Sequence, residues 1–198
     1  MAASARSQRL PADERRATIL AAAGPLFARD GYAATRIDDI AAAAGVTKPI
    51  IYRHFASKKA LYAALLRKHR DDLPSFLDRV DPAAAPGDAV ISILEHWVDY
   101  VRENRHAWVM IFRDSSGDEE IRALRDDVNL RAREVLAGFI SDRGVRIPPE
   151  QVEPTAELLS MGLAGMVLWW IDHPEVPKPV IVAVAARVIA AALGPTAD

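Results

Sequence analysis

Residues 45–62 read GVTKPIIYRHFASKKALY, and this stretch decides how the chain is expected to fold. Gly45 is a stop signal for a preceding helix, and Thr47 is an N-cap for a following one. Pro49 is compatible with that following helix because it falls in the first turn, where backbone amides lack intrahelical partners. Ser57 then caps a further helix that begins at Lys58. The stretch therefore predicts a short helix between two caps, preceded by a tight turn.

A second short helix is expected immediately upstream. Thr35 to Asp38 have the pattern of a capping box, in which an acid follows the cap by three residues. Apolar side chains then recur on one helix face, at Ile37, Ile40, Ala41 and Ala44. Two short helices, residues 36–44 and 48–55, joined by a tight turn, have the layout of a helix-turn-helix.

The outer face of the second helix carries an unusual mixture of side chains. Ile51 and Phe55 are four residues apart and are predicted to be buried, together with Val46 from the turn. The remaining arc holds Lys48, Pro49, Ile50, Tyr52, Arg53 and His54. Cations and a phenol hydroxyl can bind phosphates, an arginine or lysine can pair with a guanine edge, and an isoleucine can contact a thymine methyl. This arc is therefore predicted to contact DNA.

Charge is distributed unevenly along the 198 residues, whose net formal charge is −2. Residues 1–70 contain 13 lysines and arginines against 5 acids, a net charge of +8. Residues 71–198 contain 12 against 22, a net charge of −10. A basic first third suggests that this part of the chain meets a polyanion. The alternative is a chance separation of charges on solvated faces.

A family resemblance supports the DNA-binding interpretation. The segment IDDIAAAAGVTKPIIYRHFASKKALYAALL (37–66), with ILAAAGPLFARDGYAATR (19–36) before it, resembles the DNA-binding domain of the tetracycline-repressor (TetR) family of transcriptional regulators. The resemblance covers residues 14–66 without a gap. It is carried by Phe27, Gly31, Tyr32, Thr35, Ile40, Ala41, Gly45, Val46, Tyr52, Phe55, Ser57, Lys58 and Leu61.

The resemblance implies a role for individual positions. It places the helix-turn-helix at 36–55. The positions that match phosphate contacts of the family are Thr35, Thr47, Tyr52, His54 and Lys58, and those that match base-facing or groove-edge positions are Lys48, Pro49, Ile50 and Arg53. Arg36 completes the predicted DNA-contacting set. Lys59 stands where the family often has an acid, and it is expected to add positive charge to this surface.

The whole chain is predicted to be all-α, since alanine is abundant and β-branched runs are few. A helix over 12–30 ends at Gly31, and another runs over 58–72. After a break at DPAAAPGD (81–88), further helical patterns cover 87–104, 106–113, 118–143, 150–172 and 177–193. The predicted organisation is a flexible arm at 1–11, an N-terminal three-helix DNA-binding domain at 12–72, and a C-terminal helical ligand-binding and dimerisation bundle at 73–198.

The last two predicted helices are apolar nearly all round. A helix of this kind packs on its own chain on one side and on something else on the other. In the family that this chain resembles, the last two long helices of two subunits form a four-helix interface. The predicted interface comprises Met161, Gly165, Leu168, Val184, Arg187 and Val188. The alternative is a monomer in which both helices lie within the core.

Large and adaptable side chains accumulate in the same C-terminal part. A pocket for an apolar or aromatic effector is predicted from Trp97, Tyr100, Trp108, Phe112, Met161, Met166 and Trp169. The alternative for each of these residues is an ordinary place in the core.

Several other classes of protein fit the sequence poorly. The five histidines and the acids show no metal-ligand spacing, there is no cysteine, and no serine lies in a nucleophile elbow, so no catalytic or metal site and no cofactor are expected. No secretory signal is expected, and the longest uncharged apolar run, 161–171, is short for a membrane span.

The function predicted from these observations is that of a cytoplasmic, ligand-responsive transcriptional regulator and not an enzyme. It is expected to be a repressor that binds a palindromic double-stranded operator as a homodimer and is released by a small apolar or aromatic effector. The alternative is a helical protein-interaction adaptor that binds neither DNA nor effector. Such an adaptor would explain the apolar last helices, but it would not explain the basic residues on the exposed arc of the second short helix.

Overall fold

The structure is a computed structural model that describes residues 11–76, 86–114, 117–142 and 147–193. Within these ranges the regular structure is entirely helical, as predicted. The helices are α1 (Ala12–Ala34), α2 (Ile37–Ala43), α3 (Lys48–His54), α4 (Lys58–Asp72), the short 3-10 helix η1 (Leu73–Phe76), α5 (Pro86–Glu103), α6 (Arg105–Phe112), α7 (Glu119–Asp142), α8 (Pro149–Asp172) and α9 (Lys178–Leu193). The predicted arm lies outside the described residues apart from Pro11, as does most of the predicted break at 81–88.

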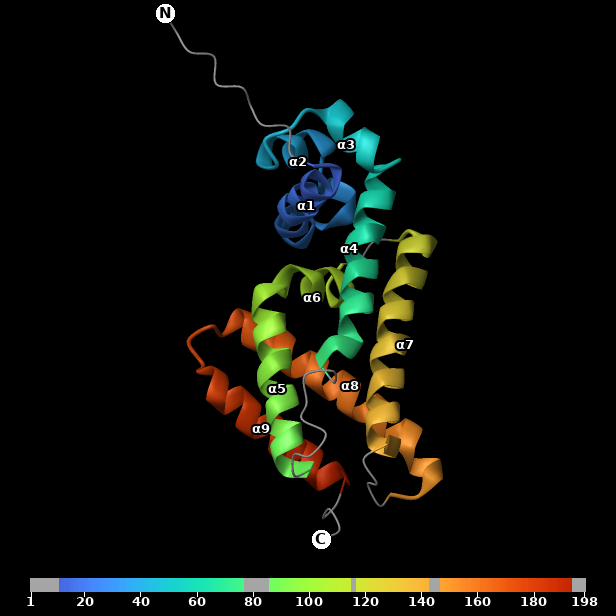
Figure 1. The fold of residues 1–198 in the computed structure, drawn as a ribbon, viewed down its shortest axis with the longest axis vertical. Coiled ribbons are helices and arrows are strands. Elements are labelled where there is room, and N and C mark those ends of the chain that lie inside the picture. The colour runs from blue at the N-terminus through green and yellow to red at the C-terminus, as the bar shows by residue number, and fades with distance from the viewer. Residues whose placement is uncertain (1–10, 77–85, 115–116, 143–146, 194–198) are drawn as a thin grey trace, which may run out of the picture.

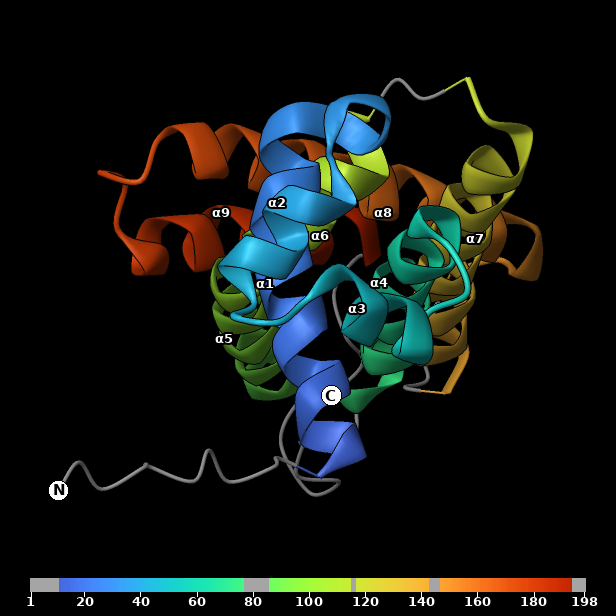
Figure 2. The same cartoon turned by 90° about the horizontal axis from the view of Figure 1, so that it is seen from above.

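The elements form an elongated bundle with two unlike ends. Figure 1 shows α1, α2 and α3 gathered at one end, whereas α5, α7, α8 and α9 build the other. Helix α4 runs from the first end towards the middle, where it lies beside α7. Seen along the long axis, α2 and α3 lie over α1, with α8 and α9 behind them (Figure 2).

The predicted helix over 12–30 is followed by one further turn after a bend at Gly31, and α1 includes both parts. Gly31 has φ 76° and ψ 166°, a backbone conformation that side chains with a Cβ rarely adopt. The glycine therefore ends the regular helix at the predicted place. Residues 32–34 form a separate short turn that leads to Thr35.

The predicted caps have different outcomes. Thr35 does not cap α2, because its buried hydroxyl donates to the carbonyl oxygen of Gly31 at 2.7 Å and the N-cap position falls to Arg36. The capping-box prediction is wrong for this reason. Thr47 does stand at the N-cap of α3, although its side chain makes no capping hydrogen bond. Ser57 caps α4 as predicted, accepting from the amide of Ala60 at 3.0 Å.

One hydrophobic cluster connects the N-terminal helices with the rest of the bundle. It includes Ile19 and Phe27 of α1, Tyr62 of α4, Met110 of α6 and Val128 of α7. The N-terminal helices and the C-terminal bundle therefore share a continuous core, with α4 between them. The domain boundary between residues 72 and 73 stays a prediction.

Helix α8 is long and apolar enough to cross a membrane by length and composition, although its uncharged run was expected to be too short. It packs along α7 and also contacts α6 and α9. Packing on α7 covers only part of its surface. The remaining apolar surface lies together with that of α9 and is described below.

Candidate nucleic-acid interface and interior cavity

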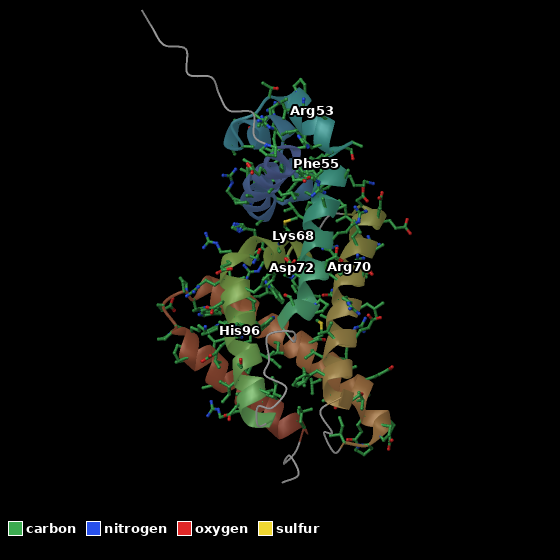
Figure 3. All side chains as sticks on the ribbon, viewed as in Figure 1. Arg53, Phe55, Lys68, Arg70, Asp72 and His96 are labelled. Atoms are coloured by element: carbon green, nitrogen blue, oxygen red, sulfur yellow. The ribbon has the colours of Figure 1, made fainter. Side chains whose placement is uncertain are left out.

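The outer face of α3 lies at the extreme end of the molecule. Ile51 and Phe55 point inwards and are fully or nearly buried, with Arg16 of α1 stacked 4.9 Å from the centre of the Phe55 ring. Tyr52 is 45% exposed and Arg53 is also exposed. Figure 3 shows Arg53 at this end of the molecule and Phe55 below it, towards the rest of the chain. The predicted burial of Ile51 and Phe55 and the predicted exposure of Tyr52 and Arg53 are therefore confirmed.

Most of the predicted DNA-contacting residues are brought together on this end. The exposed members of the set are Arg36, Thr47, Lys48, Pro49, Tyr52 and Arg53. Lys48 pairs with Asp38 of α2 at 3.2 Å, and both side chains are about half exposed. Ion pairs this exposed contribute little to stability, so Lys48 can exchange its partner for a phosphate. Within the residues that the structure describes, Arg36 and Arg53 make no ion pair.

Two members of the arc are less exposed than predicted. Ile50 is half-buried and packs against the core, so only part of its side chain is available to a thymine methyl. His54 is also half-buried, and its Nε2 atom is buried without a hydrogen-bond partner in the described part of the chain. Both residues are therefore only partly available on the outer face of α3.

The structure gives Thr35 and Lys58 roles other than the predicted phosphate contacts. The Thr35 side chain is 3% exposed and its hydroxyl is bonded within the chain. The Lys58 ammonium donates to the carbonyl oxygens of Tyr32, Ala33 and Thr35 at 2.8, 3.1 and 3.0 Å. Because an ammonium has three N–H groups, these bonds use its full donor capacity. Both residues are thus removed from the exposed set.

The charge of Lys59 is also used inside the chain. Its ammonium lies 2.9 Å from a carboxylate oxygen of Asp118 and 3.0 Å from one of Glu120, at the start of α7. Hydrogen bonds to the two carboxylates raise the pKa of Lys59, Asp118 having the larger effect. Lys59 therefore joins α4 to α7, and its expected contribution to the basic surface does not appear.

A second site is a cavity of about 350 Å³ inside the C-terminal bundle. Of the predicted pocket residues, Trp97, Trp108, Phe112 and Met161 line it. Tyr100, Met166 and Trp169 are not among its lining residues, and each has a different environment. Tyr100 bonds His69 and Asp72, Met166 packs on a neighbouring part of the core, and Trp169 is 48% exposed and stacks on His173.

Helix α7 supplies a wall of this cavity that the sequence did not reveal. Its lining residues are Asp126, Asn129, Ala132, Arg133, Val135, Leu136, Phe139 and Ile140. The polar end of the wall faces Glu157 and Ser160 of α8, and Arg133 pairs with Glu157 at 2.7 Å. The apolar positions at 132, 135, 136 and 139 recur at helical spacing, which is a weak signal for one buried face and none for a cavity.

The cavity and the N-terminal helices are connected through buried polar contacts of α4. Tyr62 is fully buried, and its hydroxyl donates to Asp114 at 2.6 Å, just after α6. The backbone amide of Tyr32, in the last turn of α1, donates to the same carboxylate oxygen at 3.3 Å. Burial raises the pKa of Tyr62, and the Asp114 carboxylate adds to this effect. Movements of α6 can therefore reach α1 and α4.

His69 occupies a buried position further along α4. It is 2% exposed, its Nδ1 atom lies 2.8 Å from the Tyr100 hydroxyl, and its ring meets the Trp108 ring edge-on, with centroids 5.2 Å apart. Burial lowers the pKa of His69 to about 4, although the Asp72 carboxylate acts in the opposite direction. The imidazole is therefore neutral at pH 7.

An apolar surface on α8 and α9 remains exposed. Its large members are Leu158 (70%), Met161 (52%), Trp169 (48%), Val180 (48%) and Val188 (53%). Of the predicted interface residues, Met161, Gly165, Arg187 and Val188 are exposed, whereas Leu168 and Val184 are half-buried. A Cβ added at Gly162 or Gly165 would meet no atom within 4 Å, so another backbone could approach there.

Comparison with known proteins links the N-terminal part to one family. Residues 19–65 match the profile of a family described as bacterial regulatory proteins, tetR family. The transcriptional activator FasR of Mycolicibacterium smegmatis is 36% identical over 110 residues, which are 55% of this chain and 50% of that protein. The chain thus matches about half the length of this curated relative.

Solved structures resemble the chain over nearly its full length. A tetR-family transcriptional regulator from Streptomyces coelicolor has a TM-score of 0.72 and 27% identity, with 92% of this chain and 82% of that chain covered. AibR, solved with isovaleryl coenzyme A and operator DNA, has a TM-score of 0.65 and 22% identity, with 87% and 96% covered. The AibR match shows the shared fold alone.

Proposed function

Because residues 19–65 match the tetR family of bacterial regulatory proteins, we propose that the chain belongs to this family and is a ligand-responsive, DNA-binding transcriptional regulator that acts as a cytoplasmic homodimeric repressor. The observation that carries this proposal is the outer face of α3. That face exposes Lys48, Tyr52 and Arg53 on a helix whose other side is anchored by Ile51 and Phe55. A short, firmly packed helix that presents cations and a phenol is suited to the major groove of DNA.

The exposed residues have different tasks in this proposal. Thr47, Tyr52 and Arg36 donate hydrogen bonds to phosphates and set the register of the helix on the duplex. Lys48 and Arg53 reach base edges or the groove margin, Pro49 borders the same surface, and the exposed part of Ile50 contacts a thymine methyl. His54, which is half-buried, completes the phosphate contacts from the end of α3.

Two copies of the chain are needed to read a palindromic operator. The exposed apolar surface of α8 and α9 is the proposed interface, and Gly162 and Gly165 allow the helices to approach closely. A two-fold axis through this surface places one α3 in each half-site, about 34 Å or a multiple of it apart along the duplex. Dimerisation raises operator affinity because the second half-site is bound at a high effective concentration.

The interior cavity is the proposed effector site. Cavities of this size, lined mostly by apolar and aromatic side chains with a few polar groups, are typical of small-molecule sites. AibR was solved with an acyl-coenzyme A and operator DNA, and its fold is shared with this chain, which supports a ligand-controlled regulator. An effector acts here by binding one spacing of the two α3 helices more tightly than another. Coupling typical of allostery changes operator affinity by about 5- to 150-fold.

The experiment that tests this function has two stages. Purified full-length protein is incubated with fragmented genomic DNA from its source at about 100 mM salt, and retained fragments are sequenced and measured individually. The proposal predicts a shared palindromic sequence that binds far more tightly than random DNA. A panel of apolar and aromatic compounds is then screened for release of the fragment. Failure to retain any DNA would support the adaptor alternative.

A further inference from the structure

The interior cavity is polar on one side only. Among the described residues that line it, the charged and polar ones form a stripe along α7 and α8, which consists of Asp126, Asn129, Arg133, Glu157 and Ser160. The lining residues from η1, α5, α6 and α9 are aliphatic or aromatic. Asp126 and Glu157 are exposed, so the cavity reaches the surface at this polar stripe. A ligand that fills the cavity is therefore expected to have one polar end, and that end lies between α7 and α8.

The one cation of the polar stripe already has a partner. Arg133 pairs with Glu157 at 2.7 Å, across the two helices. Asp126 makes no ion pair within the described residues, not even with the exposed Arg122 one turn before it. Seven residues separate Asp126 from Arg133, which is roughly 10 Å along a helix and about one Debye length at 0.1 M salt. Two carboxylates against one guanidinium give the stripe a net charge of −1, and the unpaired charge is that of Asp126.

The hydrogen-bonding groups of the stripe also favour a donor. The Ser160 hydroxyl donates to the backbone carbonyl oxygen of Glu157 at 2.9 Å, so its oxygen is left to accept. The Asp126 carboxylate can only accept, and the Asn129 amide can do either. A ligand head that donates several hydrogen bonds therefore finds acceptors along the stripe.

An anionic head fits the same stripe poorly. A carboxylate on the ligand would only accept hydrogen bonds, and it would be repelled by Asp126. It could reach the Arg133 guanidinium only by displacing Glu157, which would leave a second carboxylate unpaired beside the bound anion. The charge around the cavity acts in the same direction, because residues 71–198 carry a net charge of −10.

We propose that the cavity binds a cationic amphiphile, whose single ammonium group lies in the polar stripe near Asp126 while its apolar body lies against α5, α6 and α9. This inference rests on the proposed effector role of the cavity and adds the ligand class to it. The apolar side offers no partner to a second charge, so the ligand is charged at one end only.

The first test compares three heads on one chain. The full-length protein is titrated calorimetrically with n-octylammonium, 1-octanol and octanoate at about pH 7, where the amine is protonated and the acid is ionised. One octylammonium is expected to bind per chain, about threefold more tightly than octanol and about tenfold more tightly than octanoate. The first difference is modest because the site is partly exposed, and repulsion enlarges the second. Equal affinities, tightest binding of octanoate, or no measurable binding of all three would overturn the proposal.

A dication distinguishes the cavity from the acidic surface of the domain. Octane-1,8-diammonium has the same chain length as octylammonium and an ammonium group at each end. An acidic surface would bind the dication more tightly, because both charges are attracted. The cavity should bind it about tenfold or more weakly than octylammonium, because the second ammonium would be buried among apolar side chains. A dication that binds as tightly as octylammonium, or more tightly, would contradict the proposal.

Three variants locate the preference for the cation. Asp126→Asn keeps the size of the side chain and removes its charge, and it should reduce the preference for octylammonium over octanol to about 1.5-fold or less. Glu153→Gln is the matched control, since it removes one charge from an exposed position of α8 outside the cavity lining, and it should keep the preference. Arg133→Gln releases Glu157 and should raise the affinity for octylammonium about twofold.

These positions are exposed or partly exposed, so the variants are expected to fold. A full preference in Asp126→Asn, an equal loss in Glu153→Gln, or weaker octylammonium binding in Arg133→Gln would overturn the proposal.

The outcomes separate this inference from the proposed function. If the three heads bind in another order, the cationic class is wrong, and DNA binding by the outer face of α3 is unaffected. If the parent protein retains no DNA, the proposed regulator is wrong even where octylammonium is preferred.

Discussion

The ammonium group of Lys58 lies 2.8 Å from the carbonyl oxygen of Tyr32 and 4.6 Å from the centre of the Tyr32 ring. It thus joins the beginning of α4 to the end of α1, where Gly31 turns the chain and leaves carbonyl groups without helical partners. The contact fixes the angle at which the helix-turn-helix meets α4. In the proposed regulator, Lys58 therefore serves DNA binding indirectly, by holding the geometry of the N-terminal helices.

Replacing Lys58 should cost stability and leave the ionic component of DNA binding nearly intact. Lys58→Ala is expected to lower the free energy of unfolding by about 1–2 kcal/mol, since hydrogen bonds from a charged group are lost at a partly exposed site. The slope of log affinity against log salt should change little. In the matched variant Lys48→Ala, stability should hold and the slope should fall by about one. Urea unfolding measures the free energy of unfolding, and titrations of DNA at several salt concentrations measure the slope. The reverse pattern would show that Lys58 binds a phosphate.

Two neighbouring residues of α3 should have different effects on DNA binding. Tyr52→Phe removes one hydroxyl and should weaken binding several-fold on all sequences alike, as the loss of a phosphate contact does. Arg53→Ala should cost about 1–3 kcal/mol on the preferred operator and relax the preference at one base pair. Competition binding with a library of operator variants distinguishes the two. A uniform loss in Arg53→Ala would place that side chain on the backbone of the DNA.

A charge on the apolar surface of α8 and α9 should separate the subunits. Val188 is 53% exposed in the single chain, so Val188→Glu should leave the chain folded but bury an unpaired charge in the proposed interface. We expect monomers in sedimentation and a large loss of operator affinity. The control is Ile91→Glu, because this isoleucine is similarly exposed at 44% but belongs to α5 and not to α8 or α9. A dimeric Val188→Glu protein with parental affinity would rule out this interface.

Acid should destabilise the protein through His69. Its pKa is about 6.5 in the unfolded chain and about 4 in the folded one, because burial disfavours the charged ring. Between these values only the unfolded state binds the additional proton, so the free energy of unfolding falls as the pH decreases from about 6.5 to about 4. The loss should be roughly 2–4 kcal/mol.

The same measurement in His69→Asn isolates this contribution. Tyr100, Asp72, Lys68 and Trp108 surround the ring and are unchanged in the variant. His106, whose pKa is also lowered by burial and by Arg105, contributes equally to both proteins. Denaturant unfolding at several pH values should therefore give a steeper acid loss in the parent. Identical pH profiles would mean that His69 is not buried in solution.

The helices could be predicted closely because their signals are local. Gly31 and Gly45 adopt the positive φ angles that only glycine takes easily, and Ser57 makes the capping bond that its position suggests. The burial of Ile51 and Phe55 follows from their spacing within one short helix. Each of these features depends on residues no more than a few positions apart.

The errors concern contacts between residues far apart in the chain. Lys58 bonds carbonyls 23 to 26 positions earlier, and nothing near Lys58 in the sequence indicates them. The α7 wall of the cavity depends on which face of α7 meets α8, and Tyr100 leaves that cavity because Asp72 and His69 engage its hydroxyl. Such choices depend on the packing of whole helices, which periodicity within one helix does not determine.

The most direct test of the central claim, that the outer face of α3 binds DNA, is an equilibrium titration of one selected genomic fragment. The parent is compared with the triple variant Lys48→Ala, Tyr52→Phe and Arg53→Ala, whose substitutions all lie on exposed positions and should leave the fold and dimer intact. We predict that the parent binds with a marked salt dependence and that the variant loses at least about a hundredfold in affinity. Equal affinity of the two proteins, both verified as folded dimers, would contradict the account.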